Sequence, residues 1–327
     1  MVDKPTIAIY WAASCGGCEV ALLNLHQHLL DLAERCNIVF WPCLLDVKTS
    51  AIKALPDNAI DITLFNGAIC NSENAAMARL LRRVSRTLVA FGSCAHEGCV
   101  PGLSNLHPHE DYFRDIYLDP RFNDNPAGLL PAPTTVTQWG NLRLPGLHQR
   151  VTTLADHVPV DMILPGCPPE GERILELLTL LLEGPGIPSK QLVVGGSSTV
   201  CAECPRTRDG RKVARLQRIH QLIPHESHCL LEQGIVCRGV ATREGCGALC
   251  PQVNMPCSGC YGAPEGMTDQ GAAMVGALAG VMAADPDATA DTGEFVAQME
   301  LLLDAVPDYA GQFYTYSLAA SLLKGKR

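Results

Sequence analysis

Short apolar runs alternate with longer amphipathic segments along the first half of the chain. The apolar runs have the composition of buried strands and span Thr6–Trp11, Asn37–Trp41, Asp61–Phe65, Thr87–Phe91 and Val160–Leu164. Helices are predicted between several of these runs, over Glu19–Arg35, over Ser72–Arg83 with Ser72 as the N-cap, and over Pro169–Glu183. This alternation predicts a doubly wound, mostly parallel sheet.

The pattern changes after the fourth strand and again after Gly184. Residues Leu103–His157 are rich in Pro, Gly, His and Asp and lack a clean period, which indicates an insertion that packs on the sheet or on a partner. Pro and Gly residues then form a linker before a cysteine-dense segment, which is followed by an Ala/Gly/Met run at Gly271–Ala284 and a helix-like stretch at Thr292–Ala305. We predict a flavodoxin-like α/β domain at residues 1–186 and a smaller cysteine-rich domain with little regular structure at residues 187–327.

Composition narrows the class of protein. The 327 residues suffice for two domains with a buried core, and the 47% hydrophobic content against 18% charged residues indicates apolar surface that a stable partner would cover. The net charge of −9 argues against nucleic-acid binding, which needs a basic face. The chain enters a strand pattern at Thr6 without a secretory signal, and no apolar run is long enough to span a bilayer. We therefore expect a cytoplasmic protein whose thiols stay reduced.

Four cysteines follow predicted strands in the first domain, and we call them the first set. Cys15 and Cys18 follow the first strand, Cys94 follows the fourth, and Cys167 follows the last. Ligands of doubly wound sheets bind beyond the carboxyl ends of the strands, so we expect the four thiolates at one edge, where they suit a 4Fe-4S cluster or a tetrahedral zinc ion. Cys99 is a rival of Cys94 but lies further from the strand end. Buried free thiols or a redox Cys-x-x-Cys pair are the alternatives, and the latter would leave Cys94 and Cys167 unexplained.

Eight more cysteines lie between residues 201 and 260, enough for two sites of four ligands. The simplest partition assigns Cys201, Cys204, Cys229 and Cys237 to one site and Cys246, Cys250, Cys257 and Cys260 to the other. A crossed arrangement remains open, because ligands of two-cluster ferredoxins cross. Two zinc sites also remain open, since Cys-x2-Cys pairs occur in both kinds of site. Proline after Cys204 and after Cys250 favours iron–sulfur.

The remaining polar candidates have simpler interpretations. The cysteines outside the twelve are interpreted as buried or incidental thiols: Cys36, Cys43, Cys70 and Cys99. His228 is a weaker candidate ligand than the adjacent Cys229. Glu19, next to Cys18, either carries protons or, as we favour, is a solvated carboxylate at a helix N-terminus. No Gly-rich nucleotide motif or nucleophile elbow is present, so we assign no catalytic residue and no nucleotide site.

Together these motifs resemble the small, electron-transferring subunit of nickel–iron hydrogenases over nearly the whole chain. In that family a Cys-x-x-Cys, a Gly-[Ser/Thr]-Cys-Ala and a Gly-Cys-Pro-Pro carry the first cluster, and here they contain Cys15, Cys18, Cys94 and Cys167. Four stretches look most like the cytoplasmic F420-non-reducing, methyl-viologen-reducing group: Phe65–Ile69, Ala90–Ala95, Val100–Asn105 and Cys246–Cys257.

The resemblance implies three 4Fe-4S clusters. It makes the Cys246, Cys250, Cys257 and Cys260 group a medial set and the Cys201, Cys204, Cys229 and Cys237 group a distal set. Membrane-bound and periplasmic members have His where this chain has Cys201. Many of them also have a three-iron medial cluster that lacks one ligand, and in this chain Cys250 would supply that ligand. Electrons from H2 would come from a separate large subunit with the nickel–iron centre, enter at the first set and leave from the distal set. The implied acceptor is an iron–sulfur adaptor subunit that leads to a heterodisulfide reductase.

Two other functions remain open on the sequence. The cluster subunit of respiratory NADH:quinone oxidoreductase shares the first domain, but it has adjacent cysteines and lacks the second lobe. A zinc-stabilised binding module would use the same cysteine pairs without iron.

Overall fold

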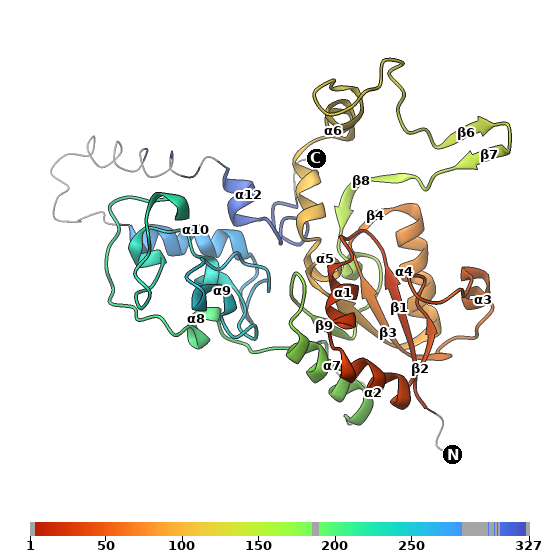
Figure 1. Ribbon diagram of the computed structural model, residues 1–327, viewed down its shortest axis with the longest axis horizontal. Coiled ribbons are helices and arrows are strands. Elements are labelled where there is room, and N and C mark those ends of the chain that lie inside the picture. Colours follow the sequence, from red (N-terminus) through yellow and green to blue (C-terminus); the bar gives the residue numbers. More distant parts are fainter. Residues whose placement is uncertain are drawn as a thin grey trace.

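The computed structural model describes residues 4–184, 190–282, 300, 304, 306 and 308–324. A six-stranded sheet forms the larger part of the molecule, and its strands follow the order β10-β9-β5-β3-β1-β2 with every neighbouring pair parallel (Figure 1). The strands are β1 (Thr6–Trp11), β2 (Asn37–Phe40), β3 (Ile60–Asn66), β5 (Ser85–Phe91), β9 (Met162–Leu164) and β10 (Leu192–Val193). The order reverses at β1, as in flavodoxin-like sheets, so the predicted fold class is confirmed.

Alternate side chains along the strands enter two apolar cores, one on each face of the sheet. Ile7 and Ile9 of β1 pack on one face under α1 (Gly17–Leu23), α2 (Gln27–Arg35) and α7 (Gly171–Glu183). Ala8 and Phe65 face the other side, under α3 (Thr49–Lys53), α4 (Ser72–Val84) and α5 (Ser93–Glu97). Helices on both faces leave the carboxyl edge of the sheet as the place where loops gather (Figure 1).

Several predicted helix boundaries were wrong. The continuous helix expected over Glu19–Arg35 is two helices, because the backbone of His26 has a positive φ of 51° and a ψ of −115°, which interrupts the helical backbone. Helix α4 is capped by Asn71 rather than by Ser72, since the Asn71 side chain accepts a hydrogen bond from the Asn74 N–H at 2.8 Å. Helix α7 begins at Gly171, two residues later than expected.

The predicted insertion leaves the sheet after α5 and returns through a short antiparallel pair (Figure 1). Its elements are η1 (Val100–Leu106), α6 (His109–Phe113), η2 (Arg114–Leu118), β6 (Thr134–Thr137), β7 (Gly140–Arg143), β8 (Leu147–Thr152) and η3 (Leu154–Asp156). Strand β8 pairs with β4 (Ile69–Asn71), while β6 and β7 form a hairpin of their own that carries the exposed Trp139. The hairpin therefore extends away from the sheet.

Among its described residues, the cysteine-rich part contains short elements and one longer helix. They are α8 (Val200–Glu203), η4 (Ile219–Gln221), η5 (Leu231–Gln233), η6 (Arg238–Ala241), α9 (Leu249–Gln252), α10 (Gln270–Val281) and α12 (Tyr309–Phe313). Helix α10 accounts for most of the predicted Ala/Gly/Met run, and its Met274 and Leu278 anchor a small apolar core with Phe313. The helix predicted over Thr292–Ala305 lies almost entirely outside the described residues.

The C-terminal segment, residues 309–324, crosses from the cysteine-rich part back to the sheet part (Figure 1). The Cys99 N–H donates to the Tyr316 carbonyl at 3.0 Å, and the Asn105 amide donates to the Lys324 carbonyl at 3.4 Å. Ala319 packs so closely against Gly98 that a Cβ at Gly98 would lie 2.5 Å from the Ala319 Cβ. The segment thus ties the two parts together. Within the described ranges, no helix has the length and apolar character needed to cross a membrane.

Candidate metal centres

The first set lies at the carboxyl edge of the sheet. Cys15 and Cys18 come between the end of β1 and the first turn of α1, Cys94 lies in α5 just after β5, and Cys167 follows β9. Cys18 and Cys94 are buried, Cys167 is half-buried and Cys15 is exposed. Burial raises the pKa of Cys18, and the charges of Glu19 and of the Cys167 and Cys15 thiols raise it further. The structure therefore brings residues from three strand ends into one neighbourhood.

Two glycines allow the turns of the first set to meet. Gly16 has a φ of 79°, and a side chain there would press on the ring of Trp11. Gly92 has a φ of 84°, and a Cβ there would lie only 2.4 Å from the Sγ of Cys18. Only glycine lets the turn after β5 approach the Cys-Gly-Gly-Cys turn so closely. The Gly17 N–H in turn points to the Cys15 Sγ at 3.4 Å.

A fifth thiol, that of Cys99, lies beside this set. Its Sγ is 3.6 Å from the Sγ of Cys167, and its side chain is 1% exposed. Cys99 is thus buried, as interpreted from the sequence, but it is not remote from the metal ligands proposed there. Of the other three cysteines outside the twelve, Cys36 is buried, Cys70 is half-buried and Cys43 is exposed.

The medial set gathers around α9. Cys250 lies within this helix and is exposed, whereas Cys257 is buried and the other two cysteines are half-buried. Burial, followed by the charge of Glu170, raises the pKa of Cys246 to about 12 and that of Cys260 to about 11. The Cys260 thiol lies within electrostatic range of Cys250, Cys246 and Cys257. Cys260 is also within this range of Cys167 of the first set, and Cys257 is within it of Cys237 of the distal set, so the medial cysteines lie between the other two sets.

The distal set lines a cavity in the cysteine-rich part. The cavity is bounded by Cys201, Cys204, Cys229 and Cys237, together with apolar residues and the side chains of Arg206 and Arg208. These are the four cysteines that the simplest partition assigns to one site. Burial raises the pKa of Cys201 to about 11, and the nearby thiols of Cys237, Cys229 and Cys204 contribute. His228 directs its Nδ1 to Asp209 at 3.2 Å.

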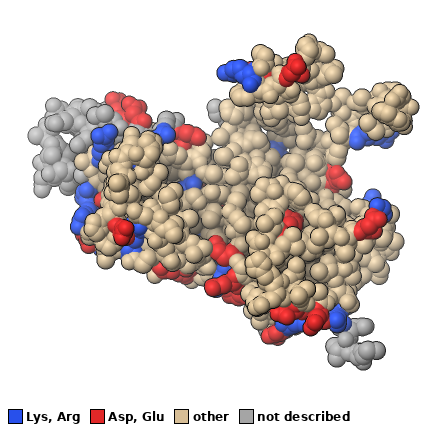
Figure 2. Space-filling model, viewed as in Figure 1, with Lys and Arg blue, Asp and Glu red and all other residues tan. Residues whose placement is uncertain are grey.

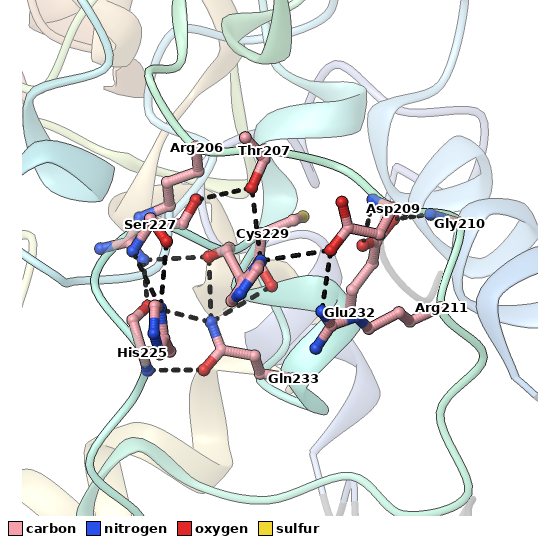
Figure 3. A network of polar contacts seen from close by, with 11 residues as sticks. Arg206, Thr207, Asp209, Gly210, Arg211, His225, Ser227, Cys229, Glu232 and Gln233 are labelled. Atoms are coloured by element: carbon pink, nitrogen blue, oxygen red, sulfur yellow. Dashed lines mark hydrogen bonds and ion pairs between the residues drawn. The ribbon is translucent and has the colours of Figure 1, made fainter.

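Two side chains hold the loop that presents Cys229 to this cavity (Figure 3). The buried Arg206 guanidinium donates to the carbonyls of Pro251 and His225 at 2.9 Å and of His228 at 3.0 Å, and to the Asn254 Oδ1 at 2.6 Å. The Gln233 side chain accepts from the His225 N–H at 2.7 Å and donates to the His228 carbonyl at 2.9 Å. Arg206 had no sequence signal beyond its place two residues after Cys204.

Direct contacts join the three sets in a row. Ser93, next to Cys94, donates its hydroxyl hydrogen to the Cys260 carbonyl at 2.5 Å and accepts from the Gly166 N–H at 3.1 Å. This links the first set to the medial set. The Cys257 N–H donates to the Cys237 Sγ at 3.2 Å and links the medial set to the distal set.

Two charged side chains lie among the three sets. Arg238, next to Cys237, is buried with its Nη1 3.0 Å from the Thr315 hydroxyl, and burial lowers its pKa while nearby thiols oppose that shift. The Glu203 carboxylate, beside Cys204, accepts hydrogen bonds from the Gly245 and Ala248 N–H groups at 3.1 Å and so orders the turn at Cys246. Neither role was evident from the sequence.

The interpretation of Glu19 as a solvated carboxylate was wrong. Its side chain is 5% exposed, and its Oε2 accepts a hydrogen bond from the Asn66 amide at 2.6 Å. Burial raises its pKa. The helix pattern gave no sign of this, because the partner lies at the end of β3, far along the chain.

The donor chemistry fits metal binding. All twelve candidate ligands are thiols, which are the ligands that iron–sulfur clusters use. Crowding and burial raise the pKa of many of them, so positive charge from bound metal is the partner that would hold them as thiolates. Among the described residues, no three His, Cys, Asp or Glu side chains converge closely enough to hold a single metal ion.

Comparisons with known proteins match either the sheet part alone or the sheet part together with the cysteine-rich part. The family model described as NADH ubiquinone oxidoreductase, 20 Kd subunit, matches residues 15–181. The iron-sulfur subunit of the F420-non-reducing hydrogenase of Archaeoglobus profundus is 33% identical over 98% of this chain and 98% of its own length. The corresponding subunit of the F420-non-reducing hydrogenase of Methanothermobacter marburgensis is 32% identical over 100% of this chain and 98% of its own. A chain of an NAD+-reducing [NiFe]-hydrogenase in the H2-reduced state is 34% identical, with a TM-score of 0.48 over 57% of this chain and 96% of that chain. The first two relatives match both the sheet part and the cysteine-rich part.

Proposed function

Because the chain belongs to the family of these F420-non-reducing hydrogenase subunits, we propose that it is the electron-transfer subunit of a heteromeric nickel–iron hydrogenase. The catalytic nickel–iron site lies on a partner subunit. The observation that carries the proposal is the row of three cysteine sets, joined by the Ser93–Cys260 and Cys257–Cys237 contacts.

We assign one 4Fe-4S cluster to each set. A bound cluster of this kind takes up and releases one electron, at a potential set by burial, nearby charge and hydrogen bonds to sulfur. The residues of this chain supply that environment. Gly92 gives room for Cys18, and the Gly17 and Cys257 N–H groups point to cysteine sulfur atoms. The buried Arg238 adds positive charge between the medial and distal sets.

The two parts of the chain divide this task. The α/β domain, residues 1–186, would carry the first set, and the cysteine-rich domain, residues 187–327, would carry the medial and distal sets. We place the protein in the cytoplasm, where a reducing environment keeps the thiols available.

The partner that supplies electrons would dock beside the first set. Large apolar side chains are exposed on the two elements that flank the exposed Cys15 in the chain: Trp11 (43%) at the end of β1, and Val20 (55%) and Leu23 (40%) in α1. Such a patch suits a stable interface with a large subunit that holds the nickel–iron centre. The acceptor beyond the distal set would be an iron–sulfur adaptor subunit and then a heterodisulfide reductase.

Elemental analysis of the anaerobically purified native complex tests the assignment. Three clusters require about twelve iron atoms per copy of this chain, with nickel present only when the large subunit copurifies. About four iron atoms with two zinc ions would contradict the proposal and make the cysteine-rich part a zinc-stabilised module.

A cysteine variant sharpens the test. Cys250→Ser should convert the medial cluster to a three-iron form with its own electron paramagnetic resonance signal in the oxidised state. Cys43→Ser, also at an exposed cysteine but outside the three sets, is the matched control and should leave both iron content and spectrum unchanged. An unchanged spectrum in Cys250→Ser would remove this residue from the ligand set.

A cluster subunit of an NADH:quinone oxidoreductase-like complex is the second candidate, because the family model over residues 15–181 has that description. The full-length match to subunits of F420-non-reducing hydrogenases, which includes the cysteine-rich part, favours the first. Reduction of the native complex by H2 but not by NADH separates the two candidates.

A further inference from the structure

A short segment of the cysteine-rich part is strongly basic in an acidic protein. Residues 206–218 contain six Lys or Arg residues and one acidic residue, Asp209, whereas the whole chain has a net charge of −9. Five of the six are exposed, and together they form what we call the basic face: Arg208, Arg211, Lys212, Arg215 and Arg218. Figure 2 shows Lys and Arg side chains at the end of the molecule that the cysteine-rich part forms.

This segment runs beside the loop that carries Cys229 of the distal set. The Thr207 N–H donates to the Ser227 carbonyl and the Cys229 N–H donates to the Thr207 carbonyl, both at 2.8 Å. Further along, the Gln217 N–H donates to the Gly234 carbonyl at 2.7 Å. Arg208 reaches from the surface to the cavity lined by the distal cysteines. The basic face therefore surrounds one side of the distal set.

The acidic groups nearby fix this segment and leave it positive overall (Figure 3). Asp209 pairs with Arg211 at 2.9 Å and with the His228 ring at 3.2 Å. The Glu232 carboxylate accepts from the Asp209 N–H at 2.8 Å and from the Gly210 N–H at 3.0 Å. These bonds give the loop a defined shape, as a docking surface requires.

An exposed apolar side chain lies close to the same surface. Ile223 is 96% exposed, and it precedes Pro224 and His225, whose carbonyls bind Asn254 and Arg206. A protein partner would gain binding energy by covering Ile223, while the surrounding cations would steer its approach.

We propose that the basic face is the docking surface for an electron-carrying protein whose own redox centre is ringed by acidic residues. The inference rests on the proposed function, in which electrons leave this chain at the distal set. Opposite charges on two redox proteins raise the association rate and orient the two centres, and salt weakens that effect. The excess of cations here selects an acidic partner over a basic one.

The test uses the complex of this chain with its large subunit, prepared without the adaptor subunit that would cover the basic face, under H2 with two acceptors. One is an acidic two-cluster ferredoxin, and the other is a small neutral quinone that needs no charged docking surface. The double variant Arg211→Glu with Arg215→Glu should lower the second-order rate of ferredoxin reduction at least about tenfold at low salt. Quinone reduction and iron content should stay unchanged. Raising the ionic strength from about 0.01 M to about 0.15 M should slow ferredoxin reduction by the wild-type complex.

Matched controls isolate the location of the charge. Lys48→Glu with Lys53→Glu makes the same change in net charge on exposed residues of the sheet part and should leave ferredoxin reduction near the wild-type rate. Arg211→Lys with Arg215→Lys should also retain it. Ferredoxin reduction that is indifferent to the Glu variant and to salt, with quinone reduction intact, would overturn the docking proposal alone. Duplex RNA that competed as strongly as ferredoxin at about 0.15 M salt would overturn it too, since the face would then bind polyanions generally. A native complex that reduced neither acceptor with H2 would instead overturn the proposed function.

Discussion

The sheet part and the cysteine-rich part reach their folds by different means. The sheet part has two apolar cores, and its fully buried side chains include Ile9, Leu64 and Phe65. The described residues of the cysteine-rich part have a small core around Met274 and a smaller apolar cluster around Val200, and polar side chains such as Arg206 shape the loops. Its helices α8 and α9 are four residues long. A fold with so little apolar burial needs another source of cohesion.

The difference indicates that folding of the cysteine-rich part depends on metal more than folding of the sheet part does. Structural metal can supply most of the folding free energy of a small domain, because the ligands are brought together only in the folded state. Here eight of the twelve candidate ligands lie in the part with few regular elements. The sheet part contributes the other four at its edge and holds itself together without them.

Removing the metal should have the largest effect on stability and should give the clearest difference in hydrogen-exchange protection between the two parts. Anaerobic oxidation and chelation of iron should abolish hydrogen-exchange protection across residues 197–262, since binding free energies of about 10 kcal/mol are lost. Amides of β1, β3 and β5 should keep most of their protection. Mass-spectrometric hydrogen exchange on the isolated chain would measure both. Equal loss in β3 and in η6 would break the comparison.

Truncating a core side chain should destabilise the sheet part directly, with no loss of metal involved. Phe65→Ala should lower the free energy of unfolding by about 3–5 kcal/mol, because Phe65 of β3 is fully buried in the apolar core that α4 covers. Urea unfolding followed by far-ultraviolet circular dichroism would measure it. Leu30→Ala in α2, where the side chain is 70% exposed, is the control and should cost less than about 0.5 kcal/mol.

The free energy of unfolding should depend on pH through Glu97, a buried carboxyl of the sheet part that lies close to Ala263 and Arg243 of the cysteine-rich part. Burial raises the pKa of Glu97 to about 8, although the Ala263 N–H and the charge of Arg243 act against this shift. The unfolded chain ionises at the ordinary carboxyl pKa, so it binds fewer protons than the folded chain between about pH 5 and pH 8. The contribution of Glu97 to the free energy of unfolding should therefore fall by up to about 1.4 kcal/mol for each unit by which the pH rises in this window.

Glu97→Gln tests that assignment, since the amide cannot ionise. Urea midpoints measured at several pH values should show a flatter profile in this variant than in the wild type. A profile as steep as that of the wild type would assign the dependence to another group.

A smaller and more local effect is expected at the distal set. Arg206→Met should cost about 2 kcal/mol, because three carbonyls each lose one hydrogen bond. The loss should show as faster hydrogen exchange at the Cys229 amide, with β3 unaffected. The exposed Arg215→Met is the control. Unchanged exchange at Cys229 would mean that Gln233 alone holds its loop.

The sequence predicted what depends on local pattern. Apolar runs located five of the six strands of the sheet, and the placement of Cys15, Cys94 and Cys167 after strands put them at one edge. The two-residue β10 was not foreseen, because so short a strand has no pattern of its own. The break at His26 was equally hidden, since no Gly or Pro marks it.

What the sequence could not give depends on contacts between distant residues. The burial of Glu19 requires Asn66, and the position of Cys99 requires both Cys167 and the carbonyl of Tyr316. The Arg206 network joins segments that are up to 48 residues apart. No role was predicted for the basic segment at residues 206–218, and its place beside Cys229 became visible only through the Thr207 hydrogen bonds.

The C-terminal segment gives the order of biosynthesis a structural meaning. Residues 309–324 bind Cys99 and Asn105 of the sheet part, although they leave the ribosome long after both. Every cysteine of the three sets precedes them in the chain, so all twelve thiols emerge before this tie can form. The contacts between the two parts that this segment makes are therefore the last to become available during synthesis, after every candidate ligand has left the ribosome.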